Sequence, residues 1–280
     1  LTSGTQQALY ILSQIAFPNE KYEILVEQPT YHRINDLLTA QKLPYQTIER
    51  TPEGIDLEEL ERIFQSSRIK FFYTIPRFHY PLGHSYSRKE KEEIIRLARL
   101  YDVYIIEDDY LADFDSKREL TFHYLDDSQH VIYIKSFSTS LFPALRITAL
   151  LFPPAIQSTF IAYKKAVDYD SNLIMQKALS LYIDNLMFEK NRLSLLNQQE
   201  KELTRARKLL SQNQLKLSYF INRDGILLDL RGLKSVSSLK HSNLPLDFFE
   251  ASYIQDCPYQ YAKIKYEDLE KVLQHLNEYL

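Results

Sequence analysis

A hydroxyl-rich segment in the middle of this sequence could bind a phosphate group. Ser136 and Ser138 directly follow an apolar run, Val131 to Ile134, that predicts a buried strand, and Arg146 closes the same segment. Serine hydroxyls donate hydrogen bonds to phosphate oxygens, and a guanidinium can hold two oxygens at once. The alternative for Arg146 is a structural ion pair at the start of the next strand.

A group of acidic residues follows another predicted strand. The run Val103 to Ile106 is continuously apolar, as expected of a strand covered on both faces, and Glu107-Asp108-Asp109-Tyr110 comes directly after it. A carboxylate at the carboxyl edge of a sheet can pair with a ring nitrogen of a ligand and keep it protonated. Taken alone, such residues are also common as helix caps or in a solvated loop.

The composition is that of a folded globular protein. Apolar residues make up 45% and charged residues 25% of the sequence, the net charge is -3, and the isoelectric point is near 6.2. This balance argues against nucleic-acid binding through phosphate neutralisation by this chain itself. The single cysteine, Cys257, cannot form an internal disulfide, which fits a cytoplasmic location. The sequence has no apolar run that approaches a membrane span and no cluster with metal-site spacing.

The elements that must position the polar residues alternate between helical and strand patterns up to about residue 150. This alternation predicts an α/β fold in which crossover helices connect the strands of a parallel sheet. Capping signatures mark two helix starts, Asp56 with Glu59 and Ser87 with Glu90. Helices are expected at residues 5–16, 31–41, 57–65 and from Ser87 to Tyr101, and strands at 23–27, 45–48, 69–74, 103–106 and 131–134.

The remainder of the chain predicts long helices and a small α+β lobe. The terminal helix is amphipathic, with its apolar residues on one face. The predicted division is a large domain of residues 1–190 and a small C-terminal domain of residues 191–280. The expected elements are a strand at 146–152, helical structure at 155–187, a long helix at 189–212, strands at 215–221 and 225–230, and a helix at 266–280.

The segment from Ser136 to Arg146 resembles a cofactor-binding loop that lacks its reactive residue. It reads S-F-S-T-S-L-F-P-A-L-R, and it is similar to T-F-S-K-T-L-F-P-G-L-R in pyridoxal-phosphate (PLP) proteins. The resemblance is strongest to the aminotransferase-like domain of the MocR/GabR branch of GntR-family regulators, which also have the sequence E-D-D-Y. Thr139 stands where that pattern has lysine. A threonine hydroxyl cannot form the imine that a lysine amine forms with PLP.

The resemblance implies a fold and a set of cofactor contacts. The fold would be that of PLP-dependent transferases, the aspartate aminotransferase fold type I, with an N-terminally truncated large domain and a small α+β C-terminal domain. Asp108 would hold the pyridinium nitrogen, and Tyr110 would donate to the phenolic oxygen. Ser136, Ser138 and Arg146 would bind the phosphate.

Other segments carry further implied contacts. Ser3-Gly4-Thr5-Gln6 resembles an S-G-A-Q turn, in which the N–H groups of a helix start point at the phosphate. Tyr31, in E-Q-P-T-Y, matches the aromatic residue that stacks on the pyridine ring, and core packing is the alternative in a chain with 21 tyrosines. His79 stands where the family has Gln or Asn donating to the phenolic oxygen. Without the family, His79 would be interpreted as a surface histidine or a satisfied loop histidine.

The chain also departs from the family pattern. Lys135, Ala144 and Thr148 occupy positions where the pattern usually has glycine. The segment at residues 257–264 should supply an arginine for a substrate carboxylate, and it contains Lys263, which brings charge without a bidentate fork. We therefore assign no catalytic residue.

The resemblance implies the effector-binding and oligomerisation domain of a MocR/GabR-like transcriptional regulator, with any PLP bound non-covalently. Its partners would be a small-molecule effector, either PLP or amino-acid-like, and a second copy of the chain. DNA would be contacted only through a winged-helix domain that precedes this segment. One alternative is a PLP-dependent aminotransferase acting on an amino acid, which Thr139 opposes. Another is an interaction scaffold with an empty pocket.

Overall fold

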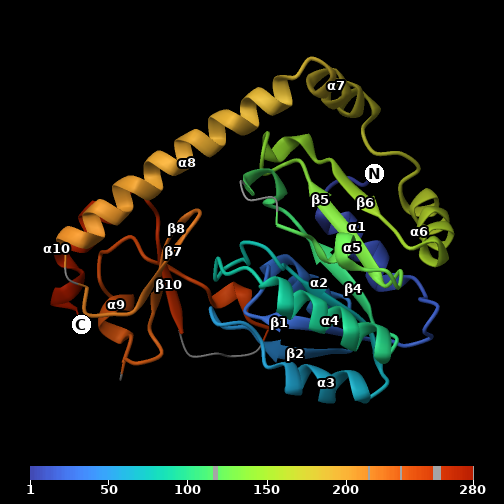
Figure 1. The fold of residues 1–280 in the computed structure, drawn as a ribbon, viewed down its shortest axis with the longest axis horizontal. Helices are drawn as coiled ribbons and strands as arrows, with labels where there is room; N and C mark the ends of the chain where they lie inside the picture. The colour runs from blue at the N-terminus through green and yellow to red at the C-terminus, as the bar shows by residue number, and fades with distance from the viewer. Residues whose placement is uncertain (116–118, 214, 234, 255–259, 280) are drawn as a thin grey trace.

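The chain forms two β-sheets that are connected by a long helix. The computed structural model describes residues 1–115, 119–213, 215–233, 235–254 and 260–279. A six-stranded sheet has the order β2-β1-β3-β4-β5-β6, and a four-stranded sheet has the order β7-β8-β10-β9. Helix α8 (Met187–Gln212) runs from the larger part of the molecule to the smaller part along one side (Figure 1).

The larger sheet confirms the predicted α/β alternation. Strands β1 to β5 pair in parallel. Strand β3 and helix α3 have the predicted bounds, the other predicted elements of this region differ by one or two residues at an end, and the short helix α5 was not predicted. The strands are β1 (Glu23–Gln28), β2 (Tyr45–Glu49), β3 (Ile69–Thr74), β4 (Tyr104–Asp108) and β5 (Val131–Ser136), and the helices are α1 (Thr5–Gln14), α2 (His32–Ala40), α3 (Leu57–Gln65), α4 (Arg88–Leu100) and α5 (Phe122–Leu125).

Alternate residues of the strands build two apolar cores, one on each face of the larger sheet. In β1, Ile24 and Val26 pack into one core and Leu25 into the other, because successive strand side chains point to opposite faces. Helices α1, α2 and α6 contribute to the first core, and α3, α4 and α5 to the second. The interpretation of the continuous apolar runs as strands covered on both faces is therefore confirmed.

The helix starts follow the capping signatures. Ser87 and Glu90 form a reciprocal capping box at the start of α4. Asp56 accepts hydrogen bonds from the backbone N–H groups of Glu58 and Glu59 at the start of α3. Each cap satisfies backbone donors that have no partner within the helix, and this fixes where the helix begins.

The loop after β5 corrects the predicted start of the next strand. Residues Pro143–Leu145 form a 3-10 turn, which leaves Arg146 in the left-handed region with a φ of 50°. Strand β6 (Thr148–Leu151) begins two residues later and pairs antiparallel with β5. The extended pattern of the sequence did not reveal that the turn continues through Arg146.

The helical region after β6 is also broken where continuous helix was expected. Helix α6 (Pro154–Val167) ends at Asp168, which is extended, and α7 (Leu173–Asp184) begins after Asn172. The side chain of Asn172 accepts a hydrogen bond from the N–H of Met175 and so caps the new helix. Polar residues before Leu173 were the available signal for this second helix start.

The smaller sheet is antiparallel and is covered by helices, which confirms the predicted small α+β lobe. Its core contains Leu210 from α8, Ile226 and Leu228 from β8, and Val272 from the terminal helix. That helix is shorter than predicted, because it begins at Leu269 rather than Tyr266 and its last turn continues as a 3-10 helix at Leu276–Glu278. The elements are β7 (Tyr219–Asn222), β8 (Gly225–Asp229), α9 (Ser237–Lys240), β9 (Asp247–Phe248), β10 (Tyr261–Ile264) and α10 (Leu269–His275).

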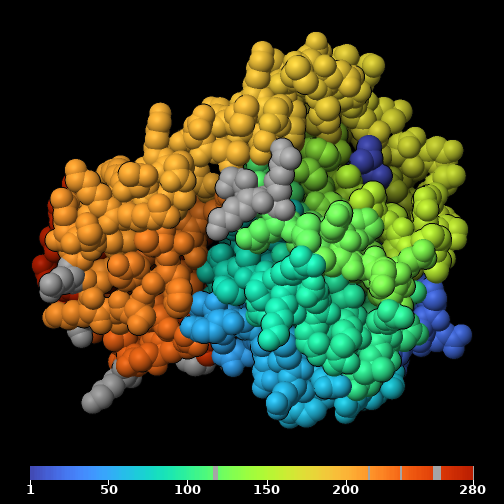
Figure 2. All heavy atoms as spheres, in the orientation of Figure 1, coloured from blue at the N-terminus to red at the C-terminus, as the bar shows by residue number. Residues whose placement is uncertain are grey.

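The loop after β3 packs directly against the smaller lobe. Leu82 lies in an apolar cluster with Leu227 of β8. Asn222 donates a hydrogen bond of 2.7 Å from Nδ2 to the carbonyl of Leu82. In the space-filling view the two lobes lie side by side, with α7 and α8 along the upper rim (Figure 2). Among the described residues, no helix is long and apolar enough to cross a membrane.

Candidate functional site

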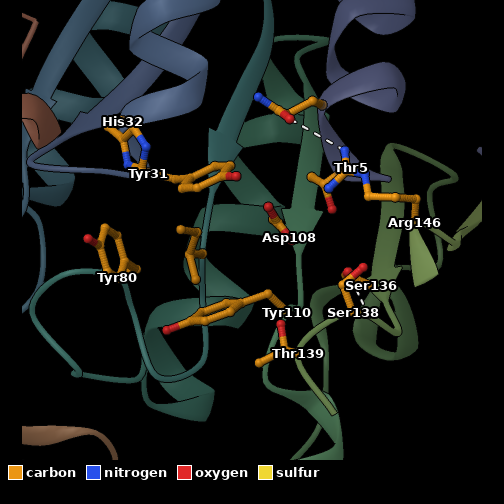
Figure 3. A pocket seen from close by; sticks show the side chains of 12 residues that line it. Thr5, Tyr31, His32, Tyr80, Asp108, Tyr110, Ser136, Ser138, Thr139 and Arg146 are labelled. Atoms are coloured by element: carbon orange, nitrogen blue, oxygen red, sulfur yellow. Dashed lines mark hydrogen bonds between the residues drawn. The ribbon is translucent and has the colours of Figure 1, made fainter. Parts of the chain in front are cut away.

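A cavity of about 320 Å³ lies at the carboxyl edge of the larger sheet (Figure 3). Parallel strands β4 and β5 end at the same edge, so Asp108 and Ser136 are brought together. Most of the residues singled out from the sequence line this cavity. The lining consists of Thr5, Gln6, Tyr31, His32, Ile75, Tyr80, Asp108, Tyr110, Ser136, Ser138, Thr139 and Arg146.

One end of the cavity is formed by the start of α1 and by Arg146. Thr2 pairs with Thr148 of β6 through two backbone hydrogen bonds, which place the first turn of α1 beside the Arg146 loop. Nη2 of Arg146 donates to the carbonyl of Ser3 at 3.3 Å and to Oε1 of Gln6 at 3.4 Å. The first turn of α1 has no side-chain cap. Its N–H groups and the guanidinium together provide a cationic, donor-rich end.

Gly4 is part of this end through its backbone and does not itself line the cavity. It has a φ of +92°, which L-residues rarely adopt. A Cβ at this position would lie 2.4 Å from Nη2 of Arg146. Glycine therefore permits the close approach of Arg146 to the start of α1.

Ser136 is the last residue of β5, and Ser138 lies on the loop that follows this strand. The backbone N–H of Ser138 donates to Oγ of Ser136 at 3.2 Å. Oγ of Ser138 is buried and has no hydrogen-bond partner among the described residues. In Figure 3 both hydroxyls lie near Arg146 and Thr5. A buried hydroxyl without a partner is costly, so this group fits a ligand oxygen.

Asp108 lies at the end of β4, between the aromatic and the cationic ends of the cavity (Figure 3). The hydroxyl of Tyr73 donates to its Oδ2 at 2.8 Å, and its buried Oδ1 has no hydrogen-bond partner among the described residues. Burial raises the pKa of Asp108 to about 7, and the nearby charge of Asp109 adds to this effect. The free oxygen can accept a hydrogen bond from a ligand N–H.

Tyrosine rings form the other end of the cavity. Tyr31 and Tyr80 meet edge to face, with their ring centroids 6.4 Å apart. Burial raises the pKa of Tyr31, and the charge of Asp108 raises it further, so its hydroxyl stays protonated. The hydroxyl of Tyr110 donates to the carbonyl of Phe78 at 3.0 Å. The expected donation from Tyr110 to a ligand oxygen would therefore require it to change partner.

His79 does not line the cavity, and this corrects its expected position as a ligand donor. Its ring is fully buried, with Nε2 3.2 Å from Oε2 of Glu27. The pKa of His79 is lowered because burial disfavours the cation more strongly than Glu27 favours it. Arg50 lies on the other oxygen of Glu27, so His79 belongs to a buried polar cluster behind the site.

The described lining of the cavity contains Thr139 and no lysine. Lys135 is directed elsewhere and forms an ion pair with Asp113. Lys164 is buried and donates to the carbonyl of Asp168 at 2.9 Å. In this conformation, therefore, neither lysine can supply the reactive amine that Thr139 lacks.

The hydrogen-bond donors and acceptors of the site match the polar groups of PLP, so the site fits PLP held without a covalent bond. The cationic end supplies partners for a phosphate, the unpaired oxygen of Asp108 can accept from a pyridinium nitrogen, and Tyr31 contributes an aromatic ring to the lining. Sequence reasoning missed His32, Ile75 and Tyr80, which also line the cavity. Ile75 directly follows β3, so its place at a strand end was the available signal.

Comparison with known proteins gives one family for most of the chain. The model of the family described as aminotransferase class I and II matches residues 1–237. A protein of Bacillus subtilis described as the uncharacterized HTH-type transcriptional regulator YcxD is 37% identical over 100% of this chain and 67% of its own length. The aromatic-amino-acid aminotransferase 1 of Thermococcus litoralis is 28% identical over 68% of this chain and 47% of its own length.

The fold is shared with solved aminotransferases. The structure of a Pyrococcus horikoshii kynurenine aminotransferase superposes with a TM-score of 0.86 at 23% identity, covering 100% of this chain and 74% of that chain. These matches confirm the fold type I architecture and the resemblance to aminotransferase-like domains of the MocR/GabR type. The chain belongs to the aminotransferase class I and II family.

Proposed function

We propose that this chain is the effector-binding domain of a MocR/GabR-like transcriptional regulator, and that it holds PLP or a PLP-like ligand without a covalent bond. The observation that carries the proposal is the cavity itself, which has donors for a phosphate and a carboxylate for a pyridinium, with Thr139 in its lining. The similarity to a protein described as a transcriptional regulator over the full chain supports the regulatory part.

The residues of the chain would each have a defined task. Arg146, Ser138 and the first turn of α1 would bind the phosphate, because they place a cation and hydrogen-bond donors at one end of the cavity. Asp108 would orient the ring by accepting a hydrogen bond from its nitrogen. Bound PLP supplies an electron-accepting ring to enzymes of this fold, and the chemistry they perform requires an amine that Thr139 does not provide.

A PLP titration of the purified protein tests this proposal. We expect a change in the visible absorbance of PLP that saturates near one equivalent, with no lysine adduct in the mass spectrum after borohydride reduction. A stoichiometric adduct on one lysine would favour the aminotransferase alternative. No saturable response would overturn the cofactor site and leave the interaction scaffold.

A matched pair of arginine substitutions controls for charge. Arg146→Met removes the cation that lines the cavity, whereas Arg33→Met removes an arginine on α2 whose side chain is 50% exposed. We expect Arg146→Met to weaken PLP binding at least about 10-fold, since charge-assisted hydrogen bonds contribute about 1.5–3 kcal/mol each. Equal affinities of the two variants would contradict the phosphate assignment.

We also infer that a second copy of the chain covers the helices after β6. Large apolar side chains are exposed there, and a monomer rarely exposes so many in one region. They include Ile174, which is 80% exposed, and Leu186, which is 67% exposed. Light scattering should give a dimer mass for the native chain and a monomer mass for Ile174→Asp with Leu186→Asp, and a native monomer would refute the inference.

The organisation of the whole protein follows from the same proposal. A domain boundary near residue 190 is supported by the separate cores of the two sheets. DNA would be contacted through a winged-helix domain outside this chain. The chain itself spans about two thirds of the length of its Bacillus subtilis relative. The low net charge of this chain and its single cysteine support a cytoplasmic effector domain that does not itself bind DNA.

A further inference from the structure

A second cavity adjoins the first on the side of the smaller lobe. It has a volume of about 410 Å³, and it shares Tyr80, Tyr110 and Thr139 with the lining of the first cavity. Its other walls come from residues 111–114 after β4, from α8, which contributes Glu202, and from the turn between β7 and β8, which carries Arg223 and Asp224. A ligand in this second cavity would therefore lie next to one in the first.

Arg223 is a half-buried cation whose charge is not neutralised by a described residue. It forms no ion pair among the described residues, whereas Asp224 beside it is paired with Lys263. Burial lowers the pKa of Arg223 to about 10, although the charge of Asp115 acts in the opposite direction. A guanidinium with this pKa is still charged at neutral pH, and a desolvated charge without a counterion favours an anionic ligand.

The orientation of the Arg223 guanidinium is fixed from two sides. Nη1 donates to Oε1 of Gln199 on α8, and Nε2 of Gln199 donates back to the carbonyl of Arg223 at 3.1 Å. The guanidinium carbon lies 4.2 Å from the centroid of the Phe78 ring and 5.6 Å from that of Phe114. The group is therefore held in place before any ligand binds, which lowers the entropic cost of binding.

These contacts leave two nitrogen donors on one edge of the guanidinium without a partner among the described residues. Nε is buried without a hydrogen-bond partner among the described residues, and Nη2 makes no hydrogen bond to any of them. Nε and Nη2 form the side of the fork that binds a carboxylate through two parallel hydrogen bonds. Leu195, Phe114 and Tyr110 line the same cavity and supply apolar surface beside this edge.

We propose that Arg223 is the carboxylate-binding residue of a subsite for a small carboxylic acid with an apolar body. It would take the place of the arginine that the C-terminal strand lacks, where Lys263 is already paired with Asp224. That this acid is the effector of a regulator rests on the function proposed above. Binding of a carboxylate in the second cavity does not depend on that function.

Phenylacetate and its neutral analogue phenylacetamide are suitable probes, because they differ in charge and hardly in shape. Binding of each to the full chain is measured by ligand-detected NMR titration. We expect the native chain to bind phenylacetate at least about 10-fold more tightly than phenylacetamide, since one charged bidentate contact is lost in the amide. Equal affinities, or no binding of phenylacetate, would overturn the proposal.

Substitutions then test whether Arg223 causes the preference for the acid over the amide. Arg223→Gln should remove it, and Arg223→Lys should retain only part of it, because lysine keeps the charge and loses the fork. Arg207→Gln is the control, since Arg207 lies on α8 with a side chain that is 61% exposed. A full preference for the acid in Arg223→Gln, with native-like thermal unfolding, would place the carboxylate elsewhere and refute the assignment.

The PLP titration of the native chain separates this proposal from the function proposed above. A saturable PLP response without phenylacetate binding would overturn the carboxylate subsite alone. Phenylacetate binding that depends on Arg223, without a PLP response, would support the subsite and overturn the cofactor site.

Discussion

Replacing Asp108 by asparagine should stabilise the ligand-free protein at alkaline pH. Asp108 is buried at the end of β4, and one of its oxygens has no partner among the described residues. Asparagine is nearly isosteric, can still accept the hydrogen bond from Tyr73, and carries no charge at any pH. The substitution therefore removes the cost of a buried charge and leaves the packing unchanged.

The size of the effect follows from the pKa of Asp108. The folded protein raises this pKa from 3.8 to about 7, chiefly through burial, so folding favours the protonated form. The stability of the native chain thus falls as the pH rises from about 4 to about 7 and is constant above that range. At about 1.4 kcal/mol per pH unit, the cost is on the order of 4 kcal/mol at pH 8.5 and on the order of 2 kcal/mol at pH 5.5.

Urea unfolding at the two pH values measures this difference. The gain in free energy of unfolding for Asp108→Asn over the native chain should be about 2 kcal/mol larger at pH 8.5 than at pH 5.5. Asp36→Asn is the matched control, because the Asp36 side chain is 59% exposed and its substitution should have the same small effect at both values. Equal effects of Asp108→Asn at both values would refute the reasoning, since they would mean that Asp108 is not desolvated. In excess PLP at pH 8.5, the native chain should instead have a larger free energy of unfolding than the variant, because PLP should stabilise the native chain more.

Three further substitutions test the site and the contact between the lobes. Thr139→Lys should yield a stoichiometric PLP adduct on the new lysine after borohydride reduction, measured by mass spectrometry, and its absence would mean that the cavity does not hold PLP in reach of this position. Gly4→Ala should weaken PLP binding about 10-fold, because the new Cβ would displace Arg146, and unchanged affinity in the absorbance titration would contradict this. Gly83→Ala should lower the free energy of unfolding by about 1–3 kcal/mol, because Gly83 has a φ of +76° and a Cβ there would lie 2.0 Å from Cγ of Asn222. A urea midpoint equal to that of the native chain would show that the two lobes do not depend on this contact.

Local signals predicted the elements that depend mainly on neighbouring residues. The capping box of Ser87 and Glu90 fixed the start of α4, and the β-branched and aromatic residues of Ile69–Thr74 fixed the bounds of β3. Both signals act over a few residues, so no knowledge of the fold is needed to read them.

Elements that depend on contacts distant in the sequence were predicted less well. Arg146 was assigned to a strand, and it adopts a left-handed conformation beside Gly4 and the start of α1. His79 was expected at the ligand, and the carboxylate of Glu27, far from it in the sequence, holds it behind the site.

The sequence by itself determined which chemical groups the site can contain. Ser136, Ser138, Arg146 and Asp108 were identifiable because their types and their positions after strands are local properties, and the threonine at position 139 is a fact of the sequence. Only the tertiary structure decided which of these groups are unsatisfied. Burial, the unpaired oxygen of Asp108 and the unpaired Nε of Arg223 depend on how distant segments pack, because desolvation is set by all the atoms around a group.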